Sequence, residues 1–354
     1  MNDAFFCGGV SAEKAEQSGG FFMRKIIIDC DPGIDDSLAL MLALSSPELD
    51  IMGITTVSGN VPADMGARNA RKVLKHMGRM DIPVYIGEQA PLKCPYTDAM
   101  DTHGQDGMGE SFLPEVPGDF PKKSAVEFLE ETLEKEKISI IALGPMTNLA
   151  KVFSKRPKLI GQVEELVSMG GNFRSHGNCS PVAEYNYWCD PDAAAICYDL
   201  FGKAGKKIEM VGLDVTRKIV LTPNILEYVC RLDPENGEFI RRITGFYMDF
   251  HWEYEKIIGC VINDPLAVAY YIDRSLCGGF DSYTAVATDG ICRGQTVVDS
   301  MDFWKKEPNS HVLVKTDAGK FMRFFFARVL KKKDGGSWQE EELILPENLW
   351  YGEE

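Results

Sequence analysis

The sequence predicts an α/β protein with an open, mostly parallel, doubly wound (Rossmann-like) sheet, helices on both faces and a largely helical C-terminal part. Two observations predict it. Short apolar runs of strand length alternate with helical stretches of about 10 to 15 residues as far as residue 215. After Thr222 the pattern is mainly helical, and from Leu276 to Ser310 it is more irregular. With no internal repeat or low-complexity linker, we expect one domain over residues 23–354, preceded by a disordered extension at residues 1–22.

The elements follow one another in a regular order. The first strand is predicted at Lys25–Ile28, because a continuous apolar run of this length is typical of a strand buried on both faces. A helix over Asp35–Leu44 follows the turn residues Pro32 and Gly33. Further strands are predicted at residues 51–57, 82–86, 138–143, 163–169 and 208–215. Further helices are predicted at residues 63–76, 125–135, 146–154 and 191–201.

The composition limits the partners and the compartment. The net charge of −15 argues against a nucleic-acid partner, because phosphate binding needs basic clusters. No apolar stretch reaches the roughly 20 residues that span a bilayer, and residues 1–20 do not show the pattern of a secretory signal. Ten cysteines without a C-x-x-C pair indicate free thiols in a reducing compartment. We therefore expect a cytoplasmic protein that binds neither nucleic acid nor membrane.

Polar residues stand where the predicted strands end. In an open parallel sheet, ligands bind outside the carboxyl ends of the strands, so we expect these residues to converge in space. They are Asp29, Asp31, Asp35, Asp36, residues 58–60, residues 144–148, residues 170–190 and Asp214.

Four of these positions form an acidic cluster, Asp29, Asp31, Asp35 and Asp36. Like charges this close raise one another's pKa unless a cation compensates them. Oxygen ligands suit a hard ion, calcium or magnesium, better than zinc. Helix N-capping by Asp35 or Asp36 would account for one or two of the acids, but not for four. An EF-hand is excluded, because its required Gly and Glu positions, counted from Asp29, hold Ile34 and Leu40.

The run Asp-x-Asp-Pro-Gly-Ile-Asp-Asp at residues 29–36 resembles the signature of the inosine–uridine-preferring nucleoside hydrolase family. The similarity extends from Lys25 to Arg328, and further motifs follow in the family's order. These are residues 55–60 (TTVSGN), 103–104 (HG), 143–148 (LGPMTN), 169–171 (MGG), Asn178, 183–186 (AEYN), 190–191 (DP) and 264–265 (DP). Several motifs in one order are far more specific than any one of them.

The resemblance implies hydrolysis of the N-glycosidic bond of ribonucleosides to ribose and free base. It implies a Ca²⁺ ion held by Asp31, Asp36, Asp264 and the main-chain carbonyl of Leu143. It also implies that Asp31 takes a proton from the calcium-bound water. Calcium acidifies its water less than zinc does, so a neighbouring carboxylate would complete the activation.

The resemblance also implies a set of substrate-binding residues. Carboxylates and amides are suitable, because each sugar hydroxyl both donates and accepts a hydrogen bond. Taken singly, the three asparagines of this set would more often be turn residues. Asp29 is expected to orient the turn instead. The implied residues are Asp35, Asn60, His103, Met169, Asn178, Glu184 and Asn186, with Tyr247 and Asn263 near the base.

The pattern breaks at the leaving group. Many family members have a histidine directly before the aspartate that corresponds to Asp264, placed to protonate the base. This chain has Asn263, and an amide cannot act as a general acid. Tyr247 and His251 share one face of an aromatic helical stretch. We predict that His251 supplies the proton, or that aromatic stacking helps the base to leave. The alternative is a core helix with one surface histidine.

The same residues are compatible with other functions. The same ribose site would serve a hydrolase of another N-riboside, and Asn263 would suit a non-catalytic binder of ribose or nucleosides. A phosphorylase needs a basic phosphate site and is disfavoured by the acidic cluster. By resemblance alone, the chain is expected to form a homodimer or homotetramer.

Overall fold

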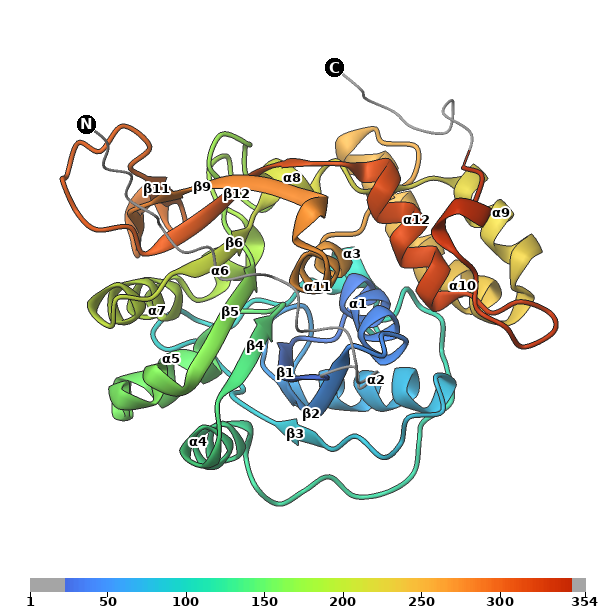
Figure 1. Cartoon of the computed structure of the whole chain (residues 1–354), viewed down its shortest axis with the longest axis horizontal. Coiled ribbons are helices and arrows are strands. Elements are labelled where there is room, and N and C mark those ends of the chain that lie inside the picture. The colour runs from blue at the N-terminus through green and yellow to red at the C-terminus, as the bar shows by residue number, and fades with distance from the viewer. Residues whose placement is uncertain (1–22, 346–354) are drawn as a thin grey trace, which may run out of the picture.

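The computed structural model describes residues 23–345, so the expected extension at residues 1–22 lies outside the described residues. Its centre is an eight-stranded sheet in the order β3-β2-β1-β4-β5-β6-β12-β9 (Figure 1). All its strands are parallel except β9, which is antiparallel to β12. The strands are β1 (Arg24–Cys30), β2 (Leu49–Thr56), β3 (Val84–Ile86), β4 (Ile138–Ala142), β5 (Val163–Met169), β6 (Ile208–Val211), β9 (Cys277–Ser282) and β12 (Ser310–Thr316).

Helices cover both faces of the sheet, as predicted (Figure 1). Successive side chains of β1 point to opposite faces, so Ile26 and Ile28 belong to one apolar core and Ile27 to the other. The first core is closed by α1 (Ile34–Leu44), α2 (Ala63–His76), α9 (Pro223–Leu232), α10 (Pro234–Glu255), α11 (Asp264–Ile272) and α12 (Ala318–Val329). The second is closed by α4 (Ala125–Lys135), α5 (Thr147–Lys155) and α7 (Pro191–Lys203).

Shorter elements fill the connections. The short helices are α3 (Met100–His103), α6 (Tyr185–Cys189) and α8 (Leu213–Thr216). The 3₁₀ helices are Pro157–Gln162, Arg274–Leu276, Gly290–Cys292 and Glu340–Glu342. Two-stranded sheets are formed by β7 (Val220–Leu221) with β8 (Cys260–Val261), and by β10 (Thr284–Val286) with β11 (Thr296–Val298).

Two sequence predictions are corrected. The strand expected at residues 208–215 ends at Val211, because Gly212 begins the helical turn of α8. The stretch expected to be irregular, Leu276–Ser310, contains β9, β10 and β11, and β9 extends the main sheet by pairing with β12. β12 and the edge strand β9, the last two strands on one side of the sheet, come late in the chain, where the strand–helix alternation no longer predicts the pairing.

The order of the strands locates the crevice of the fold. The chain moves outward from β1 to β2 and β3, then returns to the other side of β1 with β4, so the order reverses between β1 and β4. The loops after these two strands separate at such a point and leave a crevice at the carboxyl edge. There the Leu143 amide donates to the Asp29 carbonyl at 2.7 Å, which joins the two loops at their bases.

Within residues 23–345, each helix is too short or too polar to cross a bilayer.

Candidate active site

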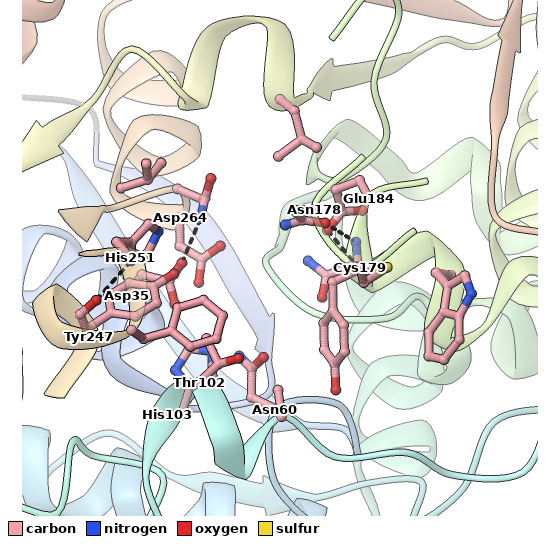
Figure 2. Close-up of a pocket in the computed structure, with 18 of the residues that line it drawn as sticks. Asp35, Asn60, Thr102, His103, Asn178, Cys179, Glu184, Tyr247, His251 and Asp264 are labelled. Carbon is pink, nitrogen blue, oxygen red and sulfur yellow. Dashed lines mark hydrogen bonds between the residues drawn. The ribbon is translucent and has the colours of Figure 1, made fainter. Parts of the chain in front are cut away.

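A single cavity of about 390 Å³ opens at this crevice. It gathers almost all of the predicted site residues from seven separate segments of the chain. Those that line it are Asp35, Asn60, His103, Leu143, Met169, Asn178, Glu184, Asn186, Tyr247, His251, Asn263 and Asp264. Asp31 and Asp36 are fully buried directly behind this lining. Figure 2 shows Asp35, Asp264, Tyr247 and His251 on one side of the cavity, with Asn178 and Glu184 facing them across it.

The Asp31 carboxylate is held between two glycine backbones. A Cβ atom on Gly59 would collide with Asp31 Oδ2, and one on Gly144 would collide with Asp31 Oδ1. This close approach explains why both loop motifs carry glycine at these positions. The Asn60 amide donates to Oδ2 at 2.7 Å, whereas Oδ1 is buried without a partner among residues 23–345. One oxygen of Asp31 is therefore fixed, and the other is left for a ligand.

Asp36 is placed for both of the functions that the sequence left open, helix capping and ion binding. At the start of α1 it accepts hydrogen bonds from the amides of Asp31 at 3.1 Å and Gly33 at 2.9 Å, so it does cap the helix. It also lies with Asp35 and Asp264 in a group whose carboxylate oxygens are within 4.8 Å of one another. Capping and ion binding are compatible here, because the two helices α1 and α11 begin side by side.

We call Asp31, Asp35, Asp36 and Asp264 the carboxylate cluster. Burial, followed by the charge of neighbouring carboxylates, raises the pKa of Asp36 to about 7 and that of Asp31 and Asp264 well above the usual range. Arg217, the only lysine or arginine among the residues lining the cavity, is paired with Glu255 instead. A bound divalent cation would neutralise this repulsion, and the all-oxygen donor set fits a hard ion.

Asp29 has a supporting position, as expected. Its carboxylate accepts hydrogen bonds from Thr55 Oγ1 at 2.5 Å and Asn148 Nδ2 at 2.8 Å. Burial raises its pKa to about 6, although both hydrogen bonds oppose the shift. Asp29 therefore fastens the end of β1 to β2 and α5 and does not reach the cavity.

The opposite side of the cavity is built from the loop after β5. Glu184 caps α6 and accepts hydrogen bonds from the amides of Gly171, Asn186 and Tyr187 at 2.9, 2.7 and 3.1 Å. Burial raises the pKa of Glu184 to about 7 despite these bonds. Asn186 Nδ2 donates to the carbonyls of Leu143 at 2.7 Å and Met169 at 3.1 Å. The loop is thus tied to the ends of β4 and β5.

The remaining side is an aromatic wall, which we define as Tyr247, Phe250, His251 and Tyr254 of α10. His251 is only 4% exposed, so the alternative of a surface histidine is wrong. Its ring lies 4.4 Å from that of Tyr247 in an edge-on arrangement, and the Tyr247 ring lies 5.3 Å from that of His103. Through this wall α10, which comes late in the chain, covers the carboxylates at the junction of β1 and α1.

The two histidines are held in opposite tautomers. His103 Nδ1 accepts the Ile34 amide proton at 3.1 Å, so its Nε2 carries the hydrogen of the neutral ring. His251 Nδ1 lies 2.9 Å from the Tyr247 carbonyl, which can only accept, so Nδ1 carries the hydrogen and Nε2 is free to take a proton. Burial lowers the pKa of both rings. His103 is therefore suited to donate a hydrogen bond, and His251 to exchange a proton.

Asn263 is joined to the carboxylate cluster. Its Nδ2 donates to Asp35 Oδ2 at 3.2 Å, and its Oδ1 is buried without a partner among residues 23–345. An amide at this place orients Asp35 but has no proton to transfer.

Some lining residues were missed, and one predicted residue lies elsewhere. Asp214 was expected in the crevice, but its carboxylate binds the amides of Phe173 at 2.6 Å and Arg174 at 2.8 Å, which anchors the loop after β5. Arg217, three residues on, lines the cavity instead. The rule that ligands bind at the ends of strands predicts that the segment after β6 lies near the cavity. Which of its side chains faces the cavity depends on the helical turn of α8. Trp188 and Glu255 also line the cavity and carried no motif.

Known proteins match this chain over most of its length. The inosine-uridine preferring nucleoside hydrolase family matches residues 26–323. Uridine nucleosidase 1 of Arabidopsis thaliana is 36% identical over 78% of this chain and 82% of its own. The structure of a plant nucleoside hydrolase superposes with a TM-score of 0.82 and 32% identity. That match covers 87% of this chain and 99% of the other. The structure of a purine-preferring ribonucleoside hydrolase from Gardnerella vaginalis superposes with a TM-score of 0.81 and 32% identity. That match covers 86% of this chain and 98% of the other.

Together with the fold and the cavity, these matches define a hydrolase that acts on the N-glycosidic bonds of nucleosides. The chain belongs to the inosine-uridine preferring nucleoside hydrolase family. The predicted family, fold class and enzyme class are confirmed.

Proposed function

We propose that this chain hydrolyses ribonucleosides to ribose and free base with the help of Ca²⁺, and that Asp31 is the general base. The observation that supports this best is the buried, unpartnered Oδ1 of Asp31, which lies among carboxylates that no lysine or arginine lining the cavity neutralises. Asp31, Asp36, Asp264 and the Leu143 carbonyl would hold the ion. When bound, Ca²⁺ would acidify a water and hold the sugar hydroxyls.

The chain's own residues then provide the general base and the electrostatic stabilisation of the transition state. Asp31 Oδ1 accepts the proton of the attacking water, while the Asn60 amide keeps Oδ2 in place. As the glycosidic bond breaks, positive charge develops on the sugar, as it does in glycosidases. The buried carboxylates nearby stabilise this charge more strongly than they would in water.

Ribose recognition is assigned to the polar side chains on both sides of the carboxylate cluster. Asp35, Asn60 and His103 approach from the side of α1, while Asn178, Glu184 and Asn186 approach from the loop after β5. A site that pairs polar groups with a 2′-hydroxyl leaves those groups unpaired when the hydroxyl is absent. Deoxyribonucleosides should therefore be cleaved about 10⁴-fold less efficiently.

The leaving base is assigned to the aromatic wall. His251 can carry a proton on Nε2 while its Nδ1–H remains bound to the Tyr247 carbonyl. It can therefore pass that proton to the base nitrogen as the bond breaks. The place before Asp264 cannot do so, because Asn263 is an amide.

A substrate panel with and without the ion tests this function. Ribose release should be measured for uridine, cytidine, inosine, adenosine and their deoxy forms, with Ca²⁺ and then with a chelator. We expect turnover of ribonucleosides, loss with chelator and recovery when Ca²⁺ is restored. Turnover that is unchanged by a chelator would contradict the calcium assignment. If ribose is released only from a different N-riboside, the assignment of the ribose site would stand and the proposed substrate would be replaced.

The compartment and the oligomeric state are two further parts of the proposal. The cysteines within residues 23–345 are all free thiols, which supports a reducing compartment such as the cytoplasm. A homodimer or homotetramer is proposed from the family alone, and light scattering after gel filtration would test it.

A further inference from the structure

The end of the cavity assigned to the base offers little acid for a departing base. Asn263 lies directly before Asp264, and its Nδ2 already donates to Asp35 Oδ2 at 3.2 Å. An amide has no proton to transfer. The remaining candidate is His251, and burial lowers the pKa of its ring, so the neutral form is favoured. A base that must be protonated therefore depends on the small protonated fraction of one histidine.

Two rings of the aromatic wall are accessible to a ligand. Phe250 and Tyr254 both line the cavity, with 4.6 Å between their ring centroids. Tyr254 is 68% exposed, and Phe250 is half-buried. The negatively polarised faces of aromatic rings attract a cation that lies against them. The wall can therefore hold a positively charged ring as well as a neutral one.

The charges around the cavity also favour a cationic ligand. Arg217 is the only lysine or arginine in the lining that residues 23–345 form, whereas six acids line the same cavity. Arg217 pairs with Glu255 at 3.0 Å, and both side chains are partly exposed, at 20% and 24%. A bound Ca²⁺ would offset charge only in the carboxylate cluster, so an excess of negative charge remains and attracts cations. The six acids are Asp35, Asp98, Asp101, Glu184, Glu255 and Asp264.

We propose that this site also hydrolyses cationic N-ribosides, whose base carries a permanent positive charge, and that it cleaves them more efficiently than neutral nucleosides. Such a base is a purine alkylated at N7 or a pyridinium ring. In both cases the ribose is unchanged, the ring can lie against the aromatic wall, and the base can leave without an acid. The inference rests on the proposed function, because it uses the same ribose site and the same general base, Asp31.

The atoms and charges of this reaction balance without a proton donor. Water supplies its oxygen to C1′, and the proton that the water loses goes to Asp31 Oδ1. The electron pair of the broken bond between C1′ and the ring nitrogen enters the ring and cancels its positive charge. The base therefore departs as a neutral molecule, and neither Asn263 nor His251 has to give it a proton. A neutral nucleoside, by contrast, needs a proton on its base in the same step.

Matched substrates that differ only in charge test the proposal. The efficiency kcat/KM of ribose release is measured with Ca²⁺ on inosine and N7-methylinosine, and on nicotinamide riboside as the pyridinium case. N7-methylinosine should be cleaved at least about 10²-fold more efficiently than inosine, which is the factor that a general acid would otherwise supply. A ratio near one would overturn the proposal. Turnover of one cationic class and not the other would assign the activity to that class.

Two variants change the charge at the wall in opposite directions. Glu255→Gln leaves Arg217 without its anionic partner, so the ratio of N7-methylinosine to inosine efficiency should fall by about 10-fold. Arg217→Met leaves the Glu255 carboxylate without its cationic partner, so the same ratio should rise by about as much. If the ion pair only braces the walls, both variants will lower both efficiencies equally, which would overturn the proposal.

The aromatic face and the missing acid are tested separately. Tyr254→Leu should lower the ratio by about 5-fold, because it removes a ring that would face the cation. Trp252→Leu is the matched control, since Trp252 is 53% exposed on the same helix and is not among the residues that line the cavity. Asn263→His supplies an acid, so it should raise the efficiency on inosine several-fold but not that on N7-methylinosine. An equal gain on both substrates would overturn the proposal.

The outcomes separate this inference from the proposed function. Turnover of inosine and uridine without turnover of either cationic riboside would leave the proposed function intact and overturn the inference. Turnover of the cationic ribosides alone would support the inference and replace the neutral substrates of the proposed function. Turnover of none of them would overturn both. Melting temperatures of the variants would show whether any loss of efficiency reflects misfolding.

Discussion

The carboxylate cluster and the aromatic wall face one cavity but are built in different ways. Asp31, Asp35 and Asp36 lie at the junction of β1 and α1, where the amides of Asp31 and Gly33 hold the Asp36 carboxylate. The Asn60 amide, from the loop after β2, holds the Asp31 carboxylate. The wall comes from one face of α10 and contacts the cluster region only through tertiary packing. Three of the four cluster residues therefore come from one short segment and only Asp264 comes from a distant helix, α11, whereas the whole wall depends on how a distant helix docks.

Burial acts on both regions with opposite consequences. In the cluster it raises the pKa of the carboxyls, and in the wall it lowers the pKa of His251, so the neutral form is favoured in each case. The cluster needs a cation to become charged, whereas His251 needs only to take a proton and lose it again. The difference indicates that the cluster holds charge throughout the reaction and that the wall carries charge only while the base departs.

The largest effect is expected in the cluster. Asp31→Asn removes the proton acceptor and should lower kcat by about 10³-fold, measured as ribose release from uridine and inosine. The control is Asp29→Asn, also buried and two residues away, which loses a support of β1 and should cost about 1–2 kcal/mol of stability with a much smaller loss of kcat. Equal losses of kcat in the two variants would remove the distinction between base and support.

A smaller effect is expected in the wall. His251→Gln should lower kcat/KM on natural nucleosides by about 10²-fold. Because the pKa of His251 is below its usual 6.5, its protonated fraction falls as pH rises through that pKa, and the wild-type efficiency should fall with it. The variant should lose this falling limb. Full turnover of inosine and uridine by His251→Ala would exclude His251 as the proton donor.

The general acid can also be moved from the aromatic wall to position 263, beside the carboxylate cluster. In a His251→Gln background, Asn263→His places an imidazole beside Asp264, where the family often has one. We expect efficiency on inosine to recover by about 10-fold, within the range of general acid catalysis. If no activity returns, the proton must reach the base by another route.

The smallest effect is expected at Gly33, which lies beside the carboxylate cluster and against His103, a neighbour of the wall residue Tyr247. A Cβ atom on Gly33 would lie 2.6 Å from His103 Nδ1 and 2.9 Å from Asn60 Nδ2, so Gly33→Ala must displace both side chains. We expect a loss of about 1–3 kcal/mol in stability and a several-fold loss in kcat/KM. Gly245→Ala in α10 is the control, since nothing lies within 4 Å of its new Cβ, and it should be neutral or slightly stabilising. Thermal melts and ribose release would measure both variants.

Much of this protein could be predicted from its sequence. Alternating strand and helix patterns predicted the parallel sheet and both of its helix layers, because hydrophobic periodicity is a local property. The motifs predicted the lining residues that follow the strands, such as Asp35, Asn60 and Glu184, because the carboxyl ends of parallel strands must meet at one edge. What the sequence determined by itself was therefore the framework and the identity of the polar groups on it.

Only the tertiary structure decided the rest. The pairing of β9 with β12 joins segments without a local signal, and the turn of α8 placed Arg217 in the cavity and Asp214 outside it. The tautomers of His103 and His251 follow from hydrogen bonds whose geometry depends on the docking of α3 and α10. Contacts between segments far apart in the chain depend on side-chain direction and packing, which no local pattern of residues records.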